Sequence, residues 1–451
     1  MKTPTPRRAA FDALIQVESK DAYANLALGQ VLGRAKLDAQ AAATVTELVN
    51  GTARLQGTYD QVIARASGRP TNKLQPAVLV VLRLVSHELL SMSTAPHAAV
   101  DQGVQLAREV VGQRVTGLVN AVSRKIAART LDEWLDLLAA TQTPVQALAT
   151  RTHHPAWIAA AHLDLLGEQE AAEALRSNNV APVPTLVIRP GLITRTELQQ
   201  QAPDATPTPY SPFGMAREGN PSDLRAVRQG RAGVQDEGSQ LMAWMLANAP
   251  VSRSATQHPW LDLCAGPGGK AALLTGLARE QESWLLAAEL APHRAGLVGR
   301  NLGAYQDGWE VVAADGARPA WQPSSFARVM ADVPCTGLGS LRRRPESRWR
   351  RTLGDLDDLV ALQAHLLRSA WESVAPGGVV AYVTCSPHRR ETIDQVQGFL
   401  AEHAGAELLD APALIPDVPA SAHPLEPRCV QLWPHRHGTD AMFGALLGKP
   451  E

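Results

Sequence analysis

From Trp260 to Cys385 the sequence alternates short apolar runs with segments long enough for helices. This alternation predicts a parallel β-sheet whose strands are joined by crossover helices on both faces. Strands are expected at 260–264, 284–289, 311–315 and 327–332, and a further strand ends at Cys385. In such a sheet the carboxyl ends of the strands share one edge, and ligands bind beyond it. The pattern therefore predicts both an α/β fold and the edge that carries a site.

The first expected strand runs directly into a glycine-rich loop. The loop and the start of the next helix are formed by Cys264, Ala265, Gly266, Pro267, Gly268, Gly269 and Lys270. Glycines let the backbone approach a ligand, and the helix N-terminus favours negative charge nearby. A dinucleotide fingerprint needs glycine and a P-loop needs Ser or Thr at position 271, where this chain has alanine. The loop therefore favours a nucleoside cofactor without a pyrophosphate, such as S-adenosylmethionine.

Acidic residues end the next three expected strands, at Glu289, Asp315 and Asp332. Glu289 lies 20 residues beyond Gly269, where an acid can accept hydrogen bonds from both ribose hydroxyls of a nucleoside. Any one of these acids alone is better interpreted as solvated surface. Three acids at three successive strand ends indicate a cofactor site.

The chain has four cysteines, which form no C-x-x-C pair and are too scattered for a disulfide framework or a metal site. Cys335 follows the strand that ends at Asp332, and Cys385 ends another strand 50 residues later. Free cysteines are usually buried small hydrophobes. A thiol at a ligand-binding edge can instead be activated. Position at a strand end does not distinguish which of the two thiols would react.

An arginine-rich run follows Cys335 directly in the sequence. It contains Arg342, Arg343, Arg344 and Arg348, with Trp349 among further arginines. Runs of this kind are often solvated charge, but the adjacency to the cysteine favours contact with RNA phosphates. Trp349 would then stack on a base.

The first 130 residues differ from the rest in period and charge. Apolar residues recur at helical spacing, as at Leu74, Val78, Leu82, Val85 and Leu89, and predict an all-α bundle. Sixteen Lys and Arg stand against nine Asp and Glu here, although the whole chain has a net charge of −1. This basic balance indicates either a polyanionic partner or merely a solvated basic surface.

The runs RRAAFDAL, LVNGTARLQGTYDQVI, LQPAVLVVLRLVSHELL, PHAAVDQGVQLA and GLVNAVSRKI resemble the NusB family of RNA-binding helical domains, over nearly all of residues 6–127. The family binds RNA through basic residues near its N-terminus. The resemblance therefore implies that Arg7 and Arg8 contact phosphates, which position RNA without reading its sequence. An exposed helix start is the alternative interpretation of these two arginines.

The segments LDLCAGPGGKAALL, DVPCTGLGSLRRRPESRWRR and YVTCSPHRRET resemble the motifs of RNA 5-methylcytosine methyltransferases. LVIRPGLITRTEL and GVQDEGSQL are similar to that family's upstream motifs, and a preceding NusB-like domain matches its RsmB (Sun/Fmu) branch. The resemblance implies that Cys264–Lys270, Glu289, Asp315 and Asp332 contact S-adenosylmethionine. It also implies that Cys385 is the nucleophile and that Cys335 assists release of the product. Two departures, Pro190-Gly191 after Arg189 and a lone Glu391 after the Cys385 motif, put local substrate contacts in doubt.

The sequence thus predicts a multidomain chain: a NusB-like helical domain at 1–130, a linker helix at 131–150, a small mixed α/β subdomain at 151–232, and a Rossmann-like methyltransferase domain at 233–451. We expect methylation of cytosine carbon 5 in small-subunit ribosomal RNA. The alternatives are the same reaction on transfer RNA and a non-catalytic RNA-binding or antitermination factor. RNA is the expected partner. Because no apolar run or signal segment is present, we expect a cytoplasmic protein without a membrane contact. We also expect a monomer that needs no metal.

Overall fold

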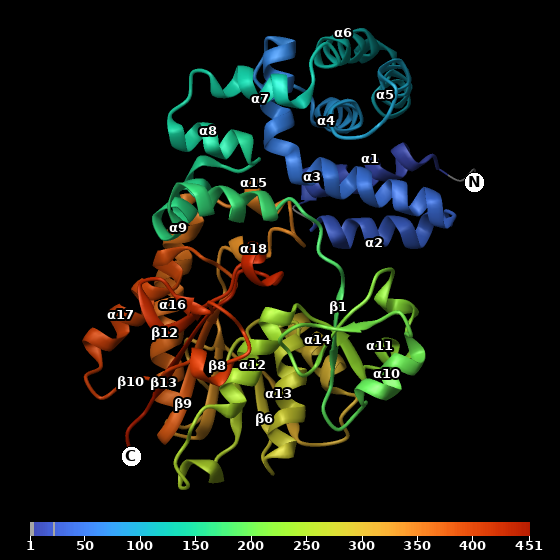
Figure 1. The fold of residues 1–451 in the computed structure, drawn as a ribbon. Coiled ribbons are helices and arrows are strands. Elements are labelled where there is room, and N and C mark those ends of the chain that lie inside the picture. Colours follow the sequence, from blue (N-terminus) through green and yellow to red (C-terminus); the bar gives the residue numbers. More distant parts are fainter. Residues whose placement is uncertain (1–3, 21–22) are drawn as a thin grey trace. The chain divides into compact units, whose positions relative to one another are not determined.

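The computed structural model describes residues 4–20 and 23–451, and it divides the chain into two compact units (Figure 1). Unit 1 runs to Asn179 and also contains Leu341–Arg350. Unit 2 consists of Val180–Ser340 and Arg351–Glu451. The arginine-rich segment after Cys335 therefore folds with the N-terminal unit, although its sequence neighbours on both sides belong to unit 2.

Unit 1 is helical throughout its described residues. Its helices are α1 (Pro6–Lys20), α2 (Ala24–Ala35), α3 (Ala39–Ser67), α4 (Pro76–Leu90), α5 (Pro96–Val110), α6 (Thr116–Ile126), α7 (Leu131–Ala139), α8 (Pro144–Arg151), α9 (Ala156–Ser177) and α15 (Ser347–Arg350), with short 3-10 turns η1 (Thr71–Lys73) and η2 (Gln113–Val115). Proline begins α4 and α5, where its missing N–H costs nothing. The apolar stripe of α4 is buried, as at Val78, Leu82 and Val85, and this confirms the predicted all-α bundle.

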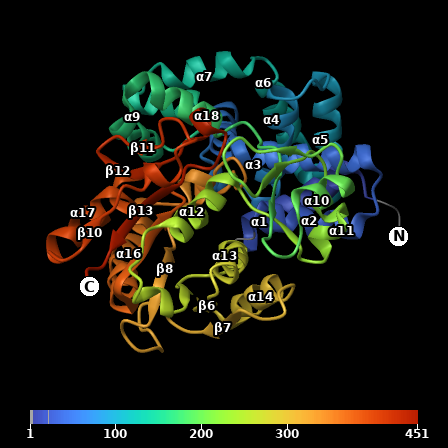
Figure 2. The same cartoon turned by 60° about the horizontal axis from the view of Figure 1, so that its bottom comes forward.

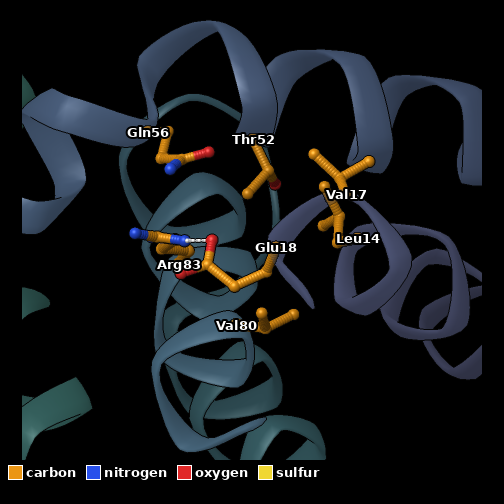
Figure 3. Close-up of a pocket in the computed structure, with 7 residues that line it drawn as sticks. All are labelled: Leu14, Val17, Glu18, Thr52, Gln56, Val80 and Arg83. Atoms are coloured by element: carbon orange, nitrogen blue, oxygen red, sulfur yellow. Dashed lines mark hydrogen bonds and ion pairs between the residues drawn. The ribbon is translucent and has the colours of Figure 1, made fainter. Parts of the chain in front are cut away.

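The core of unit 1 also holds charge. Arg83 donates to both carboxylate oxygens of Asp60, at 2.7 Å each, and to Glu18 at 2.6 Å. These residues border a small hollow lined by Leu14, Val17, Glu18, Thr52, Gln56, Val80 and Arg83, in which the Glu18 side chain meets the guanidinium (Figure 3). Because both acids neutralise Arg83, the hollow is part of the packing between α1, α3 and α4 and not a binding site for an anion.

The segment after residue 130 differs from the predicted single linker helix. Thr130 and Thr143 each form a capping box, so two separate helices, α7 and α8, begin there. Trp134 is buried, and its indole N–H donates to the carbonyl of Ile126 at 3.1 Å. Together with α9 these helices belong to unit 1, so the boundary between the units falls after Asn179 and not near residue 150.

Unit 2 begins with a small antiparallel sheet in the order β2-β3-β1-β4. Its strands are β1 (Thr185–Ile188), β2 (Thr206–Pro207), β3 (Gly214–Ala216) and β4 (Ala232–Val234). The helices α10 (Arg195–Gln201) and α11 (Arg225–Arg228), with η3 (Pro221–Asp223), lie beside it (Figure 2). Thr194 caps α10 through a capping box. The side chain of Thr194 therefore fixes where α10 begins.

A nine-stranded sheet forms the body of unit 2, in the order β11-β12-β13-β9-β8-β5-β6-β7, with β10 paired to β13. Its strands are β5 (Trp260–Asp262), β6 (Leu285–Glu289), β7 (Trp309–Ala313), β8 (Phe326–Asp332), β9 (Val374–Thr384), β10 (Glu407–Leu408), β11 (Ala422–His423), β12 (Glu426–Gln431) and β13 (Phe443–Gly448). The five strands from β9 to β7 are parallel neighbours. They are the strands predicted from the sequence, whereas the antiparallel strands after Cys385 were not predicted.

Helices cover the large sheet on both faces. They are α12 (Glu237–Asn248), α13 (Gly269–Glu280), α14 (Pro292–Leu302), α16 (Leu353–Ser373) and α17 (Ile393–Glu402). Unit 2 also contains α18 (Pro434–His437) and the 3-10 turns η4 (Ala255–Gln257), η5 (Leu338–Ser340), η6 (Arg389–Glu391) and η7 (Pro412–Leu414). In β9, Val379 and Ala381 belong to the core cluster under α12 and α13. Val380 and Tyr382 point to the cluster under α16 and α17, as the two-residue period of a strand requires. The result is the predicted α/β sandwich, and no described helix is long and apolar enough to cross a membrane.

Candidate functional site at the carboxyl edge of the sheet

The parallel order β9-β8-β5-β6-β7 brings the ends of all five strands to one edge. Four of the predicted residues lie there: Cys385 directly follows β9, Asp332 ends β8, Glu289 ends β6, and Asp315 comes two residues after β7. The glycine-rich loop follows β5 at the centre of this row. Residues predicted from separate motifs therefore meet at a single edge, as doubly wound sheets require.

The two cysteines of the predicted pair touch. Their Sγ atoms lie 3.4 Å apart, and both side chains are partly exposed. Either thiol can donate in this contact. The hydrogen bond to Cys385, burial and the charge of Glu391 raise the pKa of Cys335, which favours Cys335 as the donor. The same hydrogen bond lowers the pKa of Cys385, and the nearby Lys270 cation acts in the same direction. The pair therefore favours a thiolate at Cys385 and a thiol at Cys335.

Lys270 reaches across the edge from the first turn of α13. Its Nζ lies 2.9 Å from Oδ2 of Asp332, and only about an eighth of its side chain is exposed (12%). Burial disfavours the charged amine, but Asp332 offsets this and raises the pKa of Lys270. The edge thus holds a lysine cation and a carboxylate beside the two thiols.

The glycine-rich loop is fixed to the end of β6. The N–H of Gly266 donates to Oε2 of Glu289 at 3.1 Å, and the N–H of Ala291 donates to Oε1 of the same residue at 3.1 Å. A Cβ at position 266 would lie 2.0 Å from the Glu289 carboxylate, so this approach requires glycine. Glu289 therefore orders the loop and retains acceptor positions for further donors.

A second brace reaches the loop from the small sheet. Arg189, buried at the end of β1, donates to the carbonyl of Asn301 at 2.6 Å and to its side-chain oxygen at 3.3 Å. The amide of Asn301 then donates to the carbonyl of Pro267 at 2.7 Å. Arg189, whose following Pro190-Gly191 departs from the family pattern, thus supports the predicted cofactor loop.

Asp262, within β5, was not predicted as a site residue. It is 1% exposed, and neither carboxylate oxygen receives a well-aligned hydrogen bond, although the backbone of Cys264 acts to lower its pKa. Burial and the neighbouring Asp332 raise its pKa to about 7. A buried carboxylate without partners is costly and indicates a place for a ligand group. The sequence signal for this site was the acid inside the otherwise apolar run WLDLC, a run that by itself predicts only a strand.

Asp315 closes a local turn, because its Oδ1 accepts the N–H of Ala317 at 3.0 Å. Its contact with a cofactor therefore stays a prediction from its place at the edge.

The structure contradicts one member of the predicted RNA-binding set. Arg348 is 0% exposed inside unit 1, where its guanidinium donates to the carbonyls of His153 and Asn178 at 3.0 Å each and to Oδ1 of Asn179 at 2.6 Å. Trp349 donates its indole N–H to the carbonyls of Ala53 and Arg54. Both side chains are therefore used for folding, and Arg348 cannot contact a phosphate in this structure.

The other predicted arginines are more accessible. Arg343 and Arg344 are exposed and Arg342 is partly buried, and the Arg344 guanidinium lies 5.3 Å from the ring of Tyr23. Arg7 pairs with Glu88, and Arg8 pairs with Asp12 and Glu109. RNA contact by these five residues stays a prediction. Among the described residues no group of three or more His, Cys, Asp or Glu side chains is arranged to hold a metal ion.

Comparisons with known proteins match each of the two units to a protein family. Residues 250–448 match the family model "16S rRNA methyltransferase RsmB/F", and residues 4–128 match the NusB family. A "Putative methyltransferase" of Mycobacterium tuberculosis is 44% identical over 98% of this chain and 96% of its own length. The "Ribosomal RNA small subunit methyltransferase B" of Pseudomonas syringae is 31% identical over 98% of this chain and 97% of its own length.

Solved structures share the fold. The crystal structure of PH0851 covers 100% of both chains with a TM-score of 0.83 at 21% identity. A structure titled "NSun6 from Pyrococcus horikoshii with SFG" covers 66% of this chain and 98% of its own, with a TM-score of 0.56 at 17% identity.

Proposed function

Because the chain belongs to the RsmB/F family of methyltransferases, we propose that it methylates carbon 5 of a cytosine in small-subunit ribosomal RNA. S-adenosylmethionine is the methyl donor in this proposal, and Cys385 forms a transient bond to the base. The observation that carries it is the contact of two thiols, 3.4 Å apart, beside the Lys270–Asp332 pair at the ligand edge of the sheet.

The residues of the edge fit S-adenosylmethionine. Glu289 offers acceptors for ribose hydroxyls beside the backbone of the glycine-rich loop. The unpartnered carboxylate of Asp262 suits a cationic group, and S-adenosylmethionine carries a sulfonium and an ammonium. We therefore assign the donor to Cys264–Lys270, Glu289, Asp315 and Asp332 as expected from the sequence, and we add Asp262.

The base needs activation before it can accept a methyl group. Carbon 5 of cytosine is too electron-poor to attack a sulfonium, which is the electrophile that the bound donor supplies. Addition of the Cys385 thiolate to carbon 6 turns the ring into an enamine that is nucleophilic at carbon 5. Asp332, held by Lys270, supports protonation at N3 as charge develops on the ring.

Product release reverses the addition. A base removes the proton from methylated carbon 5, the electron pair restores the bond between carbons 5 and 6, and the thiolate of Cys385 leaves. Cys335 supports this step in our proposal, because its Sγ lies 3.4 Å from the departing sulfur, where its thiol can donate a hydrogen bond to it. The directions of the two pKa shifts support the same division of roles, with Cys385 the more readily ionised.

The ribosomal substrate is inferred from relatives. The Pseudomonas syringae relative bears the name of a small-subunit ribosomal RNA methyltransferase and aligns over nearly the whole chain. Unit 1, with its NusB family match, is the proposed RNA-binding module. Arg7, Arg8 and the exposed Arg343 and Arg344, with Arg342, are its proposed phosphate contacts. Because the thiolate must add to carbon 6 from the face of the ring, which stacked neighbours cover, the target cytosine must be unstacked.

A transfer assay tests the proposal. The full chain is incubated with methyl-labelled S-adenosylmethionine and, in parallel, unmodified small-subunit RNA, intact small subunits and transfer RNA. The expected result is 5-methylcytosine in the ribosomal substrates alone. Label confined to transfer RNA would contradict the substrate, and absence of label from all three would contradict the reaction and favour a non-catalytic RNA-binding factor.

A further inference from the structure

One buried carboxylate joins the loops of both cysteines. Glu391, at the end of η6, is 0% exposed. Its Oε1 accepts the backbone N–H of Thr336 at 2.7 Å, and its Oε2 accepts the hydroxyl of Ser386 at 2.6 Å and also the hydroxyl of Thr336. Thr336 directly follows Cys335, and Ser386 directly follows Cys385. A single side chain thus holds the residues next to both thiols.

Two further elements hold Glu391 in place. Gln363 of α16 donates to Oε1 at 3.0 Å and to the carbonyl of Pro334, the residue before Cys335, at 2.8 Å. The hydroxyl of Tyr382, in β9, donates to the backbone carbonyl of Glu391 at 2.8 Å. Both carboxylate oxygens are therefore used, and the loops after β8 and β9 have a common anchor.

The buried carboxylate of Glu391 needs donors that compensate its charge. A buried anion is costly unless donors compensate it, and four hydrogen bonds from three residues do so here. Each of these donors lies on, or also binds, a loop that carries one of the cysteines. The carboxylate thus connects the two loops that carry the cysteines.

We infer that Glu391 is a positioning residue that sets the distance between Cys335 and Cys385 by binding Thr336 and Ser386 together. The consequence for catalysis rests on the proposed function: nucleophile and release thiol must both reach one cytosine. The geometric claim itself concerns two sulfur atoms and needs no RNA.

Thiol oxidation measures that distance in the full chain. Diamide takes two electrons and two protons from a pair of nearby thiols, so that one S–S bond forms and diamide becomes a hydrazine. Glu391→Ala is expected to slow formation of the Cys335–Cys385 disulfide at least ten-fold, measured by peptide mass mapping after a quench. Glu237→Ala is the matched control, because Glu237 is also buried and accepts two backbone N–H groups, those of Tyr210 and Ser211. A rate within two-fold of the unsubstituted chain, or equal slowing by Glu237→Ala, would overturn the inference.

If Glu391→Ala fails to fold, Glu391→Gln is used instead, because glutamine keeps the shape of the side chain and removes its charge. The hydrogen bond to Cys385 and burial raise the pKa of Cys335, and the Glu391 charge adds to them. Alkylation of Cys335 at a fixed alkaline pH should therefore become faster in Glu391→Gln. A merely structural role predicts no such acceleration, and an unchanged or slower rate would also overturn the inference. A parallel arm records covalent trapping of RNA that contains 5-fluorocytosine, where Glu391→Ala is expected to lose at least ten-fold. If the unsubstituted chain traps no RNA while both thiol readouts change as expected, the proposed reaction fails and the positioning role stands.

Discussion

Replacement of Arg348 by methionine separates folding from RNA binding in the arginine-rich segment. Arg348→Met removes three hydrogen bonds from a fully buried guanidinium and leaves two carbonyls and the side-chain oxygen of Asn179 without that donor. A buried acceptor left unpaired costs about 1–3 kcal/mol. Arg348→Met also removes the cost of burying a charged guanidinium, which offsets part of the cost of the three unpaired acceptors. We therefore expect a net loss of about 3 kcal/mol in the free energy of unfolding.

Scanning calorimetry of the full chain measures this loss. For a unit of this size each kcal/mol lowers Tm by about 2–4 °C, so the transition of unit 1 should fall by about 6–12 °C. Arg344→Met is the control in the same segment, because Arg344 is exposed and has a cation–π contact that is worth about 0.5–1 kcal/mol. We expect Arg344→Met to weaken RNA binding and to change Tm little. The reasoning is refuted if Arg348→Met keeps its Tm and instead weakens RNA binding well below the transition.

Three further changes test the site. Arg189→Ala should raise the Kd of S-adenosylmethionine about 5- to 30-fold, because loss of about 1–2 kcal/mol of bracing frees Asn301 and Pro267; calorimetric titration checks it, and an unchanged Kd contradicts it. Lys270→Met should raise the pKa of Cys385, since a cation that favours the thiolate is removed; the pH profile of Cys385 alkylation should move to higher pH, and a shift to lower pH would disprove the assignment. Asp262 has its pKa raised to about 7 in the folded chain, so its ionisation destabilises the fold as pH rises from about 4 to above 7. Denaturant titrations without cofactor should therefore show that the free energy of unfolding of Asp262→Asn, relative to the unsubstituted chain, increases between pH 5 and pH 8. Cofactor binding should weaken in the same variant. A stability difference that does not change with pH would count against the buried charge.

The sequence was sufficient where a local pattern has one structural outcome. Apolar runs ending in Asp332 or Glu289 place those acids at strand ends, and the parallel order follows from the helix-length connections. Helical spacing in the first 130 residues likewise leads to a bundle. Motif resemblance added the roles of Cys335 and Cys385, which position alone does not distinguish.

The sequence was insufficient where the partner of a side chain is remote. Arg348 stands among arginines that look solvated, and its acceptors His153, Asn178 and Asn179 lie about 170 to 195 residues away. Nothing local shows that this short segment packs with the N-terminal unit. Glu391 was likewise noted only as a departure from a motif, because its bonds to Thr336 depend on two neighbouring strands.

The antiparallel strands β10 to β13 were missed for a related reason. β10 and β11 have two residues each, and β12 contains the polar residues Glu426 and Arg428. Only β13 pairs with β9, and the other three strands join the sheet through β13 or β12. Edge strands of this kind depend on the sheet that they extend.

Covalent trapping on RNA tests whether Cys385 forms the transient bond to the base. Cys385→Ala and Cys335→Ala are each incubated with S-adenosylmethionine and unmodified small-subunit RNA, and denaturing gels record protein that migrates with RNA. We predict that Cys335→Ala accumulates a denaturation-resistant adduct, whereas Cys385→Ala forms none and transfers no methyl group although it still binds RNA. Full methyl transfer by Cys385→Ala, or an adduct in that variant, would contradict the assignment of Cys385 as the nucleophile.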